Sequence, residues 1–255
     1  MILFFSDLDN TLIYSNKHRN VNDICIEINN GKEQGFMTPI TYKLFKECIK
    51  NVKFIPVTTR SIKQYQRIEW PEGFKPEIEI TTNGAMIFHN SQIDLEWINK
   101  TKLQFLKYEI ELLMLREKLI KDNKYIRCEV VDNMYLFAYC KDGVDASICA
   151  KENENKHNRL SIIASGKKLY FFPPYICKGN AVKRIKQQLN PNITVAAGDS
   201  VIDISMLNSV DIAIVPNEYL AGKITTKTKY VSDGTQPFSE FVLKTVVNIV
   251  CKNIR

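Results

Sequence analysis

Short apolar segments that stop abruptly at polar residues recur along this 255-residue chain. The first covers Ile2 to Phe5, and the carboxylates of Asp7 and Asp9 follow it closely. The others, which end in the same manner, cover 53–57, 77–80, 193–197 and 211–215. A short continuous apolar run is typical of a strand that is buried on both faces, as in a parallel sheet. The recurrence therefore predicts an α/β fold.

Helical segments separate these strands. Thr38 and Pro39 supply an N-cap and a proline at the first helical position, and Tyr42, Phe45 and Ile49 follow at helical spacing. Strands that alternate with helices are joined by right-handed crossovers, so the strand ends should share one edge of a Rossmann-like sheet. Ligands bind at that edge in open α/β sheets, and the polar residues after each strand therefore form the predicted site.

A different pattern interrupts this alternation between residues 88 and 176. One long helix is predicted over 101–121 and a shorter one over 144–151. Strand pairs are predicted over 125–131 with 134–140 and over 160–164 with 168–172, each around a polar turn. We therefore predict that 1–87 and 177–255 form one core domain and that 88–176 form an inserted α+β domain.

A hairpin is also predicted over 23–37, around the turn Asn29-Asn30-Gly31-Lys32. It follows the carboxylate pair in the chain. The hairpin therefore either covers the site or is a surface feature without a role in it.

The charge and the cysteines limit the class of protein. The net charge is +7, but no run of five or six basic residues marks a nucleic-acid-binding tail, which leaves a solvated surface or small anionic substrates. The seven cysteines are scattered without a Cys-x-x-Cys pair, and the three histidines are equally scattered. The first apolar run is too short for a signal peptide or a membrane span. We expect a cytoplasmic protein with reduced thiols and no membrane partner.

Taken in order, the strand-end residues form a recognisable set. It reads Asp-x-Asp-x-Thr from Asp7, a strand that ends in Thr58, Lys-Gly from Lys178, and Gly-Asp-x-x-x-Asp with Asp199 and Asp203. This set resembles the haloacid dehalogenase superfamily of phosphohydrolases over essentially the whole chain. The insertion after the third strand, preceded by Asn83-Gly84-Ala85, is similar to the branch with the larger α/β cap of type C2B. That branch includes the Cof-type sugar phosphatases and the sucrose-phosphate phosphatases.

The resemblance implies a core of the haloacid dehalogenase fold with a cap, at 88–176, that selects the substrate. It implies magnesium-dependent hydrolysis of a small phosphorylated metabolite, most plausibly a sugar phosphate. Asp7 would be the nucleophile that forms an aspartyl-phosphate. Asp9 would protonate the leaving alcohol and then activate water. Dehalogenation does not need the second carboxylate, so its presence favours phosphoryl chemistry.

The metal ligands implied by the resemblance are Asp7, the backbone carbonyl of Asp9, and Asp199. Magnesium prefers oxygen ligands of this kind together with waters and a substrate phosphate. Ser200 and Asp203 would surround these ligands. Asp203 could equally be an exposed acid in the first turn of a helix.

The phosphoryl oxygens would be held by Thr58, Lys178 and Asn83. Lys178 could instead be a solvated lysine at a helix start. Arg60 and Asn83 could be simple turn and cap residues.

The chain departs from the family pattern at three positions. Asn10 stands where the family usually has Gly, which the tolerance of Asn for left-handed geometry permits. Thr59 also replaces a common Gly, and Ile202 replaces an Asn near the expected metal site. The last change puts the detailed coordination in doubt and leaves the carboxylates in place.

Two other functions remain open at this point: a phosphomutase of the same fold, and a non-catalytic sensor of a phosphorylated ligand. Net transfer without phosphate release would indicate the mutase, and binding without turnover the sensor. The sequence leaves the substrate and the oligomeric state open. Arg127, Tyr135, Lys167 and Tyr170 are residues of the inserted domain to which no role is assigned.

Overall fold

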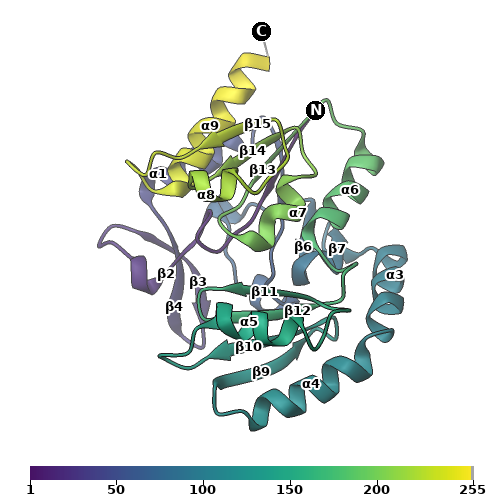
Figure 1. Ribbon diagram of the computed structural model, residues 1–255. Helices are drawn as coiled ribbons and strands as arrows, with labels where there is room; N and C mark the ends of the chain where they lie inside the picture. The colour runs from purple at the N-terminus through teal and green to yellow at the C-terminus, as the bar shows by residue number, and fades with distance from the viewer. Residues whose placement is uncertain (254–255) are drawn as a thin grey trace.

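A five-stranded parallel sheet forms the centre of the molecule in the computed structural model, which describes residues 1–253 (Figure 1). In spatial order its strands are β15 (Thr228–Val231), β14 (Ile212–Val215), β13 (Ile193–Ala197), β1 (Ile2–Ser6) and β5 (Lys53–Pro56). Every neighbouring pair is parallel. The predicted α/β fold with a parallel sheet is therefore confirmed.

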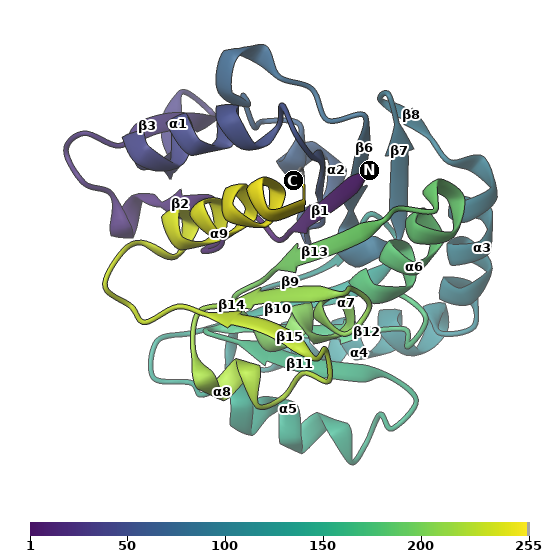
Figure 2. The same cartoon turned by 90° about the horizontal axis from the view of Figure 1, so that it is seen from above.

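Helices cover both faces of this sheet (Figure 2). Side chains alternate along β1, so Phe4 packs in one cluster with residues of α1 (Pro39–Cys48) and α9 (Phe238–Asn253). Leu3 and Phe5 pack in another cluster with residues of α6 (Lys178–Leu189), α7 (Ile204–Leu207) and α8 (Glu218–Ala221). All three side chains are fully buried. This two-sided burial explains why the strands are continuous apolar runs.

An antiparallel sheet follows on the β5 side. After α2 (Ile62–Tyr65) and η2 (Pro71–Gly73), β6 (Ile78–Thr81) joins β5 through a parallel bridge between Val57 and Ile80. β6 pairs with β7 (Met86–His89), and β7 pairs with β8 (Gln92–Ile93). The predicted limit of the inserted domain at residue 88 falls inside β7. The domain limits stay a prediction.

The predicted hairpin near the site is present as β3 (Ile24–Asn29) and β4 (Lys32–Met37). β2 (Tyr14–Ser15) pairs with β4 and adds a third strand, and η1 (Asn16–His18) follows β2. This small sheet places Glu27 beside the strand ends of the parallel sheet, as described below.

The inserted segment contains a four-stranded antiparallel sheet, here called the cap sheet, which lies below the parallel sheet in Figure 1. Its order is β11 (Ser161–Ser165), β12 (Lys168–Phe172), β10 (Tyr135–Cys140) and β9 (Tyr125–Val131). α4 (Glu109–Lys121) contacts β9 and β10, and α5 (Ala146–Glu154) contacts β11 and β12. The predicted strand pairs are both present.

The single helix predicted over 101–121 is wrong, because two helices occupy this segment. α3 (Leu95–Leu106) ends before Tyr108, which has φ −122° and ψ −4°, and α4 begins at Glu109. The two helices have different partners. α3 contacts β7, and its Trp97 Nε1 donates to Gly84 O at 2.9 Å, whereas α4 contacts β9 and β10 of the cap sheet. Ile98 and Phe105 on another side of α3 pack in the same cluster as the cap-sheet residues. The chain changes direction between them.

The turn between β9 and β10 fastens the cap sheet to the core. Asp132 Oδ2 accepts hydrogen bonds from Thr82 Oγ1 at 2.6 Å and from Ile62 N at 3.0 Å. Tyr135 donates its hydroxyl proton to Thr59 O at 2.6 Å. These contacts reach the loops that follow β5 and β6, so the cap sheet lies directly over the polar ends of those strands.

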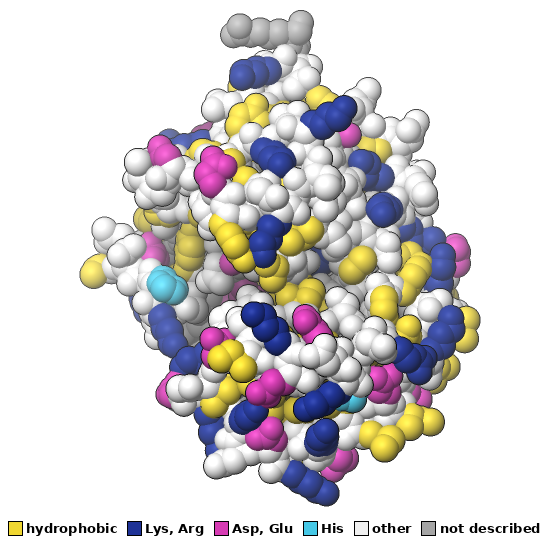
Figure 3. Space-filling view, in the orientation of Figure 1, with side chains coloured by type: hydrophobic (Ala, Val, Ile, Leu, Met, Phe, Trp, Pro, Cys, Tyr) yellow, Lys and Arg dark blue, Asp and Glu magenta, His cyan; other side chains and the backbone are white. Residues whose placement is uncertain are grey.

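No helix within residues 1–253 is long and apolar enough to cross a membrane. On the face shown in Figure 3, Lys and Arg side chains are spread over the whole surface and are interspersed with acidic ones. The positive net charge is therefore not gathered in one patch on that face.

Asp94 links the start of α3 to α6. Its carboxylate caps α3 by accepting from Trp97 N at 2.9 Å, and it accepts two hydrogen bonds from Arg184 at 3.0 and 3.1 Å. Burial alone would raise the pKa of Asp94, but the bond from Trp97 and the Arg184 guanidinium lower it.

Replacing Asp94 with Ala should lower the free energy of unfolding at pH 7 by about 1–2 kcal/mol, because the helix cap and the ion pair are both lost. Asp94→Asn keeps a capping oxygen, so it should lower the free energy of unfolding by less. Because the pKa of Asp94 is lower in the folded chain, this stabilisation is present above about pH 4 and disappears as the pH falls further.

Urea unfolding at pH 7 and pH 3 measures the effect. Glu96→Gln is the control, since it removes an exposed partner of the same arginine and should change little. If Asp94→Ala lowered the free energy of unfolding by the same amount at pH 7 and at pH 3, the charge of the Asp94 carboxylate would not be the source of the stabilisation.

Candidate active site

The ends of three parallel strands bring the predicted residues together. Ser6 of β1 lies opposite Ala197 of β13 and opposite Pro56 of β5. Asp7, Thr58 and Asp199 follow these positions by one or two residues, so they share one edge of the sheet. Asp7 N also donates to Ala197 O at 2.9 Å. Parallel register alone accounts for this placement.

Lys178, at the start of α6, is a buried cation between two carboxylates. Its side chain is 1% exposed, and its ammonium donates to Asp7 Oδ1 and, at 2.6 Å, to Asp203 Oδ1. Burial opposes the charged form, yet Asp203 and Asp7 raise the pKa of Lys178, so the ammonium stays charged. Asp203 is fully buried. Both the solvated lysine and the exposed acid considered from the sequence are therefore ruled out.

Asp203 also shapes the loop after β13. Its Oδ2 accepts from Asp199 N at 3.1 Å, Ser200 N at 3.0 Å and Ser200 Oγ at 3.2 Å. A Cβ atom on Gly198 would lie 2.5 Å from Asp203 Cβ, so glycine is required for this packing. Since both oxygens of Asp203 already have protein partners, Asp203 organises its neighbours and has no oxygen free of them.

The negative charges of the Asp7 and Asp199 carboxylates are not fully balanced by nearby cations. Carboxylate oxygens of Asp7, Asp199 and Asp203 lie within 4.8 Å of one another. Burial and the nearby Asp203 and Asp9 raise the pKa of Asp7 to about 7, although Lys178 opposes this. Burial, Asp7 and Asp203 raise the pKa of Asp199 to about 8. Paired oxygen ligands with a deficit of positive charge fit a hard divalent cation such as magnesium.

Asp9 makes a two-point ion pair with Arg60. Arg60 Nη2 and Nε donate to the two carboxylate oxygens at 2.7 and 3.0 Å. Burial would raise the pKa of Asp9, but Arg60 lowers it. Glu27, whose side chain is fully buried on β3, accepts from Arg60 Nη1 at 2.8 Å and lies 3.0 Å from Arg67 Nη2. No spacing in the chain relates these residues, so the role of Arg60 stayed open at the level of sequence and Glu27 could not be identified there.

Thr58 and Asn83 lie side by side in adjacent loops. Thr58 is fully buried and its Oγ1 accepts from Arg60 N at 3.1 Å, while Asn83 N donates to Thr58 O at 2.9 Å. Asn83 lies in η3 (Thr82–Gly84) with φ 56° and donates its side-chain amide to Ile176 O at 3.1 Å. The Asn83 side chain thus binds the segment before Lys178. Its role in phosphate binding stays a prediction.

A cavity of about 400 Å³ opens from Asp9 and Arg60 toward the cap sheet. Side chains at alternate positions of three cap strands form its far wall, as the period of a strand requires. These residues are Arg127, Glu129, Val131, Tyr135, Phe137, Tyr139, Lys168 and Tyr170.

The four unassigned residues of the inserted domain divide at this wall. Arg127, Tyr135 and Tyr170 lie in it, whereas Lys167 pairs with Asp142 away from the cavity. Lys168, the next residue, lines the cavity instead of Lys167. It was not among the residues identified from the sequence. The alternation along β12 is the signal that could have identified it.

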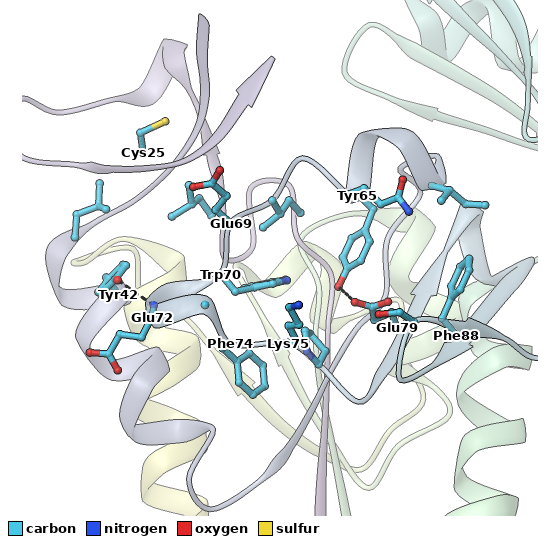
Figure 4. A pocket seen from close by; sticks show the side chains of 18 residues that line it. Cys25, Tyr42, Tyr65, Glu69, Trp70, Glu72, Phe74, Lys75, Glu79 and Phe88 are labelled. Carbon is cyan, nitrogen blue, oxygen red and sulfur yellow. Dashed lines mark hydrogen bonds between the residues drawn. The ribbon is translucent and has the colours of Figure 1, made fainter. Parts of the chain in front are cut away.

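A larger cavity of about 660 Å³ lies beside the loop 66–76 (Figure 4). Trp70 is at its centre, and Tyr65 donates its hydroxyl proton to Glu79 Oε1 at 3.0 Å. No predicted site residue lines this cavity. The cavity under the cap sheet, by contrast, is lined by Asp9.

Comparison with known proteins gives one partial family match. A family model described as haloacid dehalogenase-like hydrolase matches residues 96–217. Comparison with curated proteins finds no match.

Several solved structures share the fold over nearly all of their length. The sucrose-phosphatase of Synechocystis sp. PCC6803, solved with sucrose and phosphate, has a TM-score of 0.66 and 15% identity, with 97% of each chain covered. A haloacid dehalogenase-like hydrolase from B. subtilis has a TM-score of 0.62 and 15% identity, covering 98% of this chain and 100% of the other. The subclass IIB sugar phosphatase BT4131 has a TM-score of 0.57 and 14% identity, covering 98% and 99%.

The resemblance inferred from the motifs is thus confirmed. At these identities the structures show the fold, and the family model matches residues 96–217, which are a little under half of the chain. The chain therefore has the fold of haloacid dehalogenase-like hydrolases, and part of its sequence matches the model of that family.

Proposed function

We propose that the chain is a magnesium-dependent phosphatase that hydrolyses a small phosphorylated metabolite of the sugar-phosphate class through an aspartyl-phosphate on Asp7. The observation that supports this most is the arrangement around Asp7, with Lys178 buried against one oxygen and Asp199 beside it. Asp9 stands two residues away at the mouth of the cavity. The similar sucrose-phosphatase and sugar phosphatase structures favour the sugar-phosphate class.

Asp7 is the nucleophile in this proposal. Its ionised carboxylate attacks phosphorus, the bond from phosphorus to the alcohol oxygen breaks, and the phosphoryl group remains on Asp7. A bound magnesium ion would supply positive charge to the phosphoryl oxygens and to the carboxylates of Asp7 and Asp199. Lys178 already holds one oxygen of Asp7 and would contact a phosphoryl oxygen beside it. Thr58 and Asn83 complete the phosphate site, and Asp203 keeps Lys178 in place.

Asp9 carries the proton. It protonates the departing alcohol oxygen, and in the second step it takes a proton from the water that attacks the aspartyl-phosphate and releases inorganic phosphate. Without substrate, Arg60 keeps Asp9 ionised. Asp9 must therefore separate from Arg60 and take up a proton from solvent before it can protonate the leaving alcohol. The incoming phosphoryl group offers the guanidinium a more highly charged partner.

Asp7→Asn should lower magnesium-dependent phosphate release from a panel of phosphate esters by about a thousandfold or more, because an amide cannot act as the nucleophile. The variant should remain folded, since burial already raises the pKa of Asp7 and disfavours its charge. Circular dichroism and a phosphate-release assay measure both properties.

Asp142→Asn, which changes an exposed acid outside the cavity, is the control and should retain the wild-type rate. A wild type that is inert across a broad panel, or an active Asp7→Asn, would refute the proposal. Binding of a phosphate ester without turnover would instead favour the sensor.

Magnesium binding at pH 7 should release protons. The pKa values of Asp7 and Asp199 are raised to about 7 and about 8, so both groups are partly protonated before the ion binds, and both must ionise to coordinate it. The release should diminish above pH 8, where the carboxylates are already ionised. Calorimetric titration in two buffers of different ionisation enthalpy measures the number of protons.

Asp199→Asn should weaken binding and reduce the proton release. Magnesium binding without proton release at pH 7 would contradict the assignment of Asp7 and Asp199 as ligands.

A further inference from the structure

The arginines of the active-site cavity already have carboxylate partners. Arg60 is paired with Asp9 and with Glu27, and Arg67 lies 3.0 Å from the other oxygen of Glu27. Glu27 is fully buried behind the cavity wall, so it holds both guanidinium groups from the protein side. Neither arginine presents an uncompensated charge to the cavity in the ligand-free state.

The third arginine is compensated on the cap sheet itself. Arg127 Nη2 lies 3.1 Å from Glu129 Oε1, two residues along β9, and its guanidinium lies 5.2 Å from the centroid of the Phe137 ring. This pair is exposed and contributes little to stability. It nevertheless balances the charge of that part of the wall.

Lys168 is the exception. It is half-buried on β12 and lines the same cavity as Asp9 and Tyr170. Among residues 1–253 its ammonium group makes no hydrogen bond and no ion pair. Tyr170, Asp9 and Asp7 raise the pKa of Lys168 against the opposing effects of burial and Arg60, so the ammonium is charged at neutral pH. The cavity therefore holds one cation whose hydrogen-bonding capacity is unused.

The phosphoryl group does not require this cation. On the core side it already has the Lys178 ammonium and the ligands of a divalent ion. Lys168 approaches from the opposite wall, on the cap sheet, where the part of the substrate beyond the phosphoryl group must lie. The hydroxyl groups of a neutral leaving group could accept hydrogen bonds from the ammonium, but they would cover its charge without balancing it, whereas an anionic group does both.

We infer that the leaving group of the substrate carries a second anionic group, a carboxylate or a phosphate, and that Lys168 binds it. The inference rests on the proposed phosphatase activity and specifies its substrate class: a phosphorylated sugar acid, a related hydroxy acid, or a bisphosphate. The hydroxyl groups of Tyr139 and Tyr170 supply further donors beside Lys168 on the same wall. The Lys168 ammonium and these hydroxyls together form the recognition site.

Matched substrates that differ only in the second charge test this assignment. Glycerol 3-phosphate is compared with 3-phosphoglycerate for a carboxylate, and fructose 6-phosphate with fructose 1,6-bisphosphate for a phosphate. Wild-type kcat/KM should be higher for the more anionic member of at least one pair. Lys168→Gln should lower kcat/KM for that substrate by about 10- to 100-fold, as expected for a lost charge-assisted hydrogen bond. It should lower kcat/KM much less for the paired substrate whose leaving group is neutral.

The neighbouring lysine provides a matched control. Lys167→Gln makes the same change of charge one residue away on a side chain that points out of the cavity, so the preference should remain. The pair that shows the preference identifies the second group as carboxylate or phosphate.

Three results would overturn the inference while leaving the phosphatase proposal intact. The first is a higher wild-type kcat/KM for the substrates whose leaving group is neutral. The second is an equal loss of kcat/KM on all substrates in Lys168→Gln. The third is the same kcat/KM pattern in Lys167→Gln and Lys168→Gln. An equal loss would mean that Lys168 serves the phosphoryl group. Absence of hydrolysis on every phosphate ester would instead refute the proposed function itself.

Discussion

The buried contact of Lys178 with Asp7 and Asp203 supports both the fold and the site. It joins the start of α6 to the end of β1 and to η4 (Val201–Asp203), which are far apart in the sequence. Without the ammonium, two carboxylates would be buried next to each other with no cation to balance them, which is strongly unfavourable. With it, Asp203 can hold the loop that presents Asp199, and Lys178 contacts only one of the two oxygens of Asp7. One interaction thus sets the positions of the groups proposed for phosphoryl transfer.

The parts of the site that follow from strand geometry could be predicted from the sequence. Asp7, Thr58 and Asp199 come directly after apolar strands, and parallel register brings such ends together whatever the rest of the chain does. The contact of Arg60 with Asp9 and Glu27 could not be predicted, because it joins three segments whose relative positions depend on how the β3–β4 hairpin packs. The break at Tyr108 was missed for a related reason. The helical periodicity continues across it, and only the different partners of α3 and α4 reveal it.

In the cap sheet, the register of β12 determines which side chains face the cavity. Lys167 and Lys168 are neighbours of the same type, yet one pairs with Asp142 at the surface and the other faces the carboxylates. Lys167 lies in the turn before β12 and Lys168 is the first residue of the strand, so a shift of the strand by one residue would change which lysine faces the cavity. The sequence identified the strand and its turn correctly. It contained no information on which face would meet the core, and that depends on the docking of the Asp132 turn onto Thr82.

The alternation of the cap strands has an evolutionary consequence. The side chains that line the cavity and those that face α4 and α5 sit on the same strands at odd and even positions, so a change in one set leaves the other untouched. Exchanging Arg127, Tyr139 or Lys168 therefore alters what enters the cavity without disturbing the packing of Leu136, Leu169 or Phe171, all three fully buried. The substrate specificity of such a sheet can change one residue at a time, while the residues that keep it folded remain under separate selection.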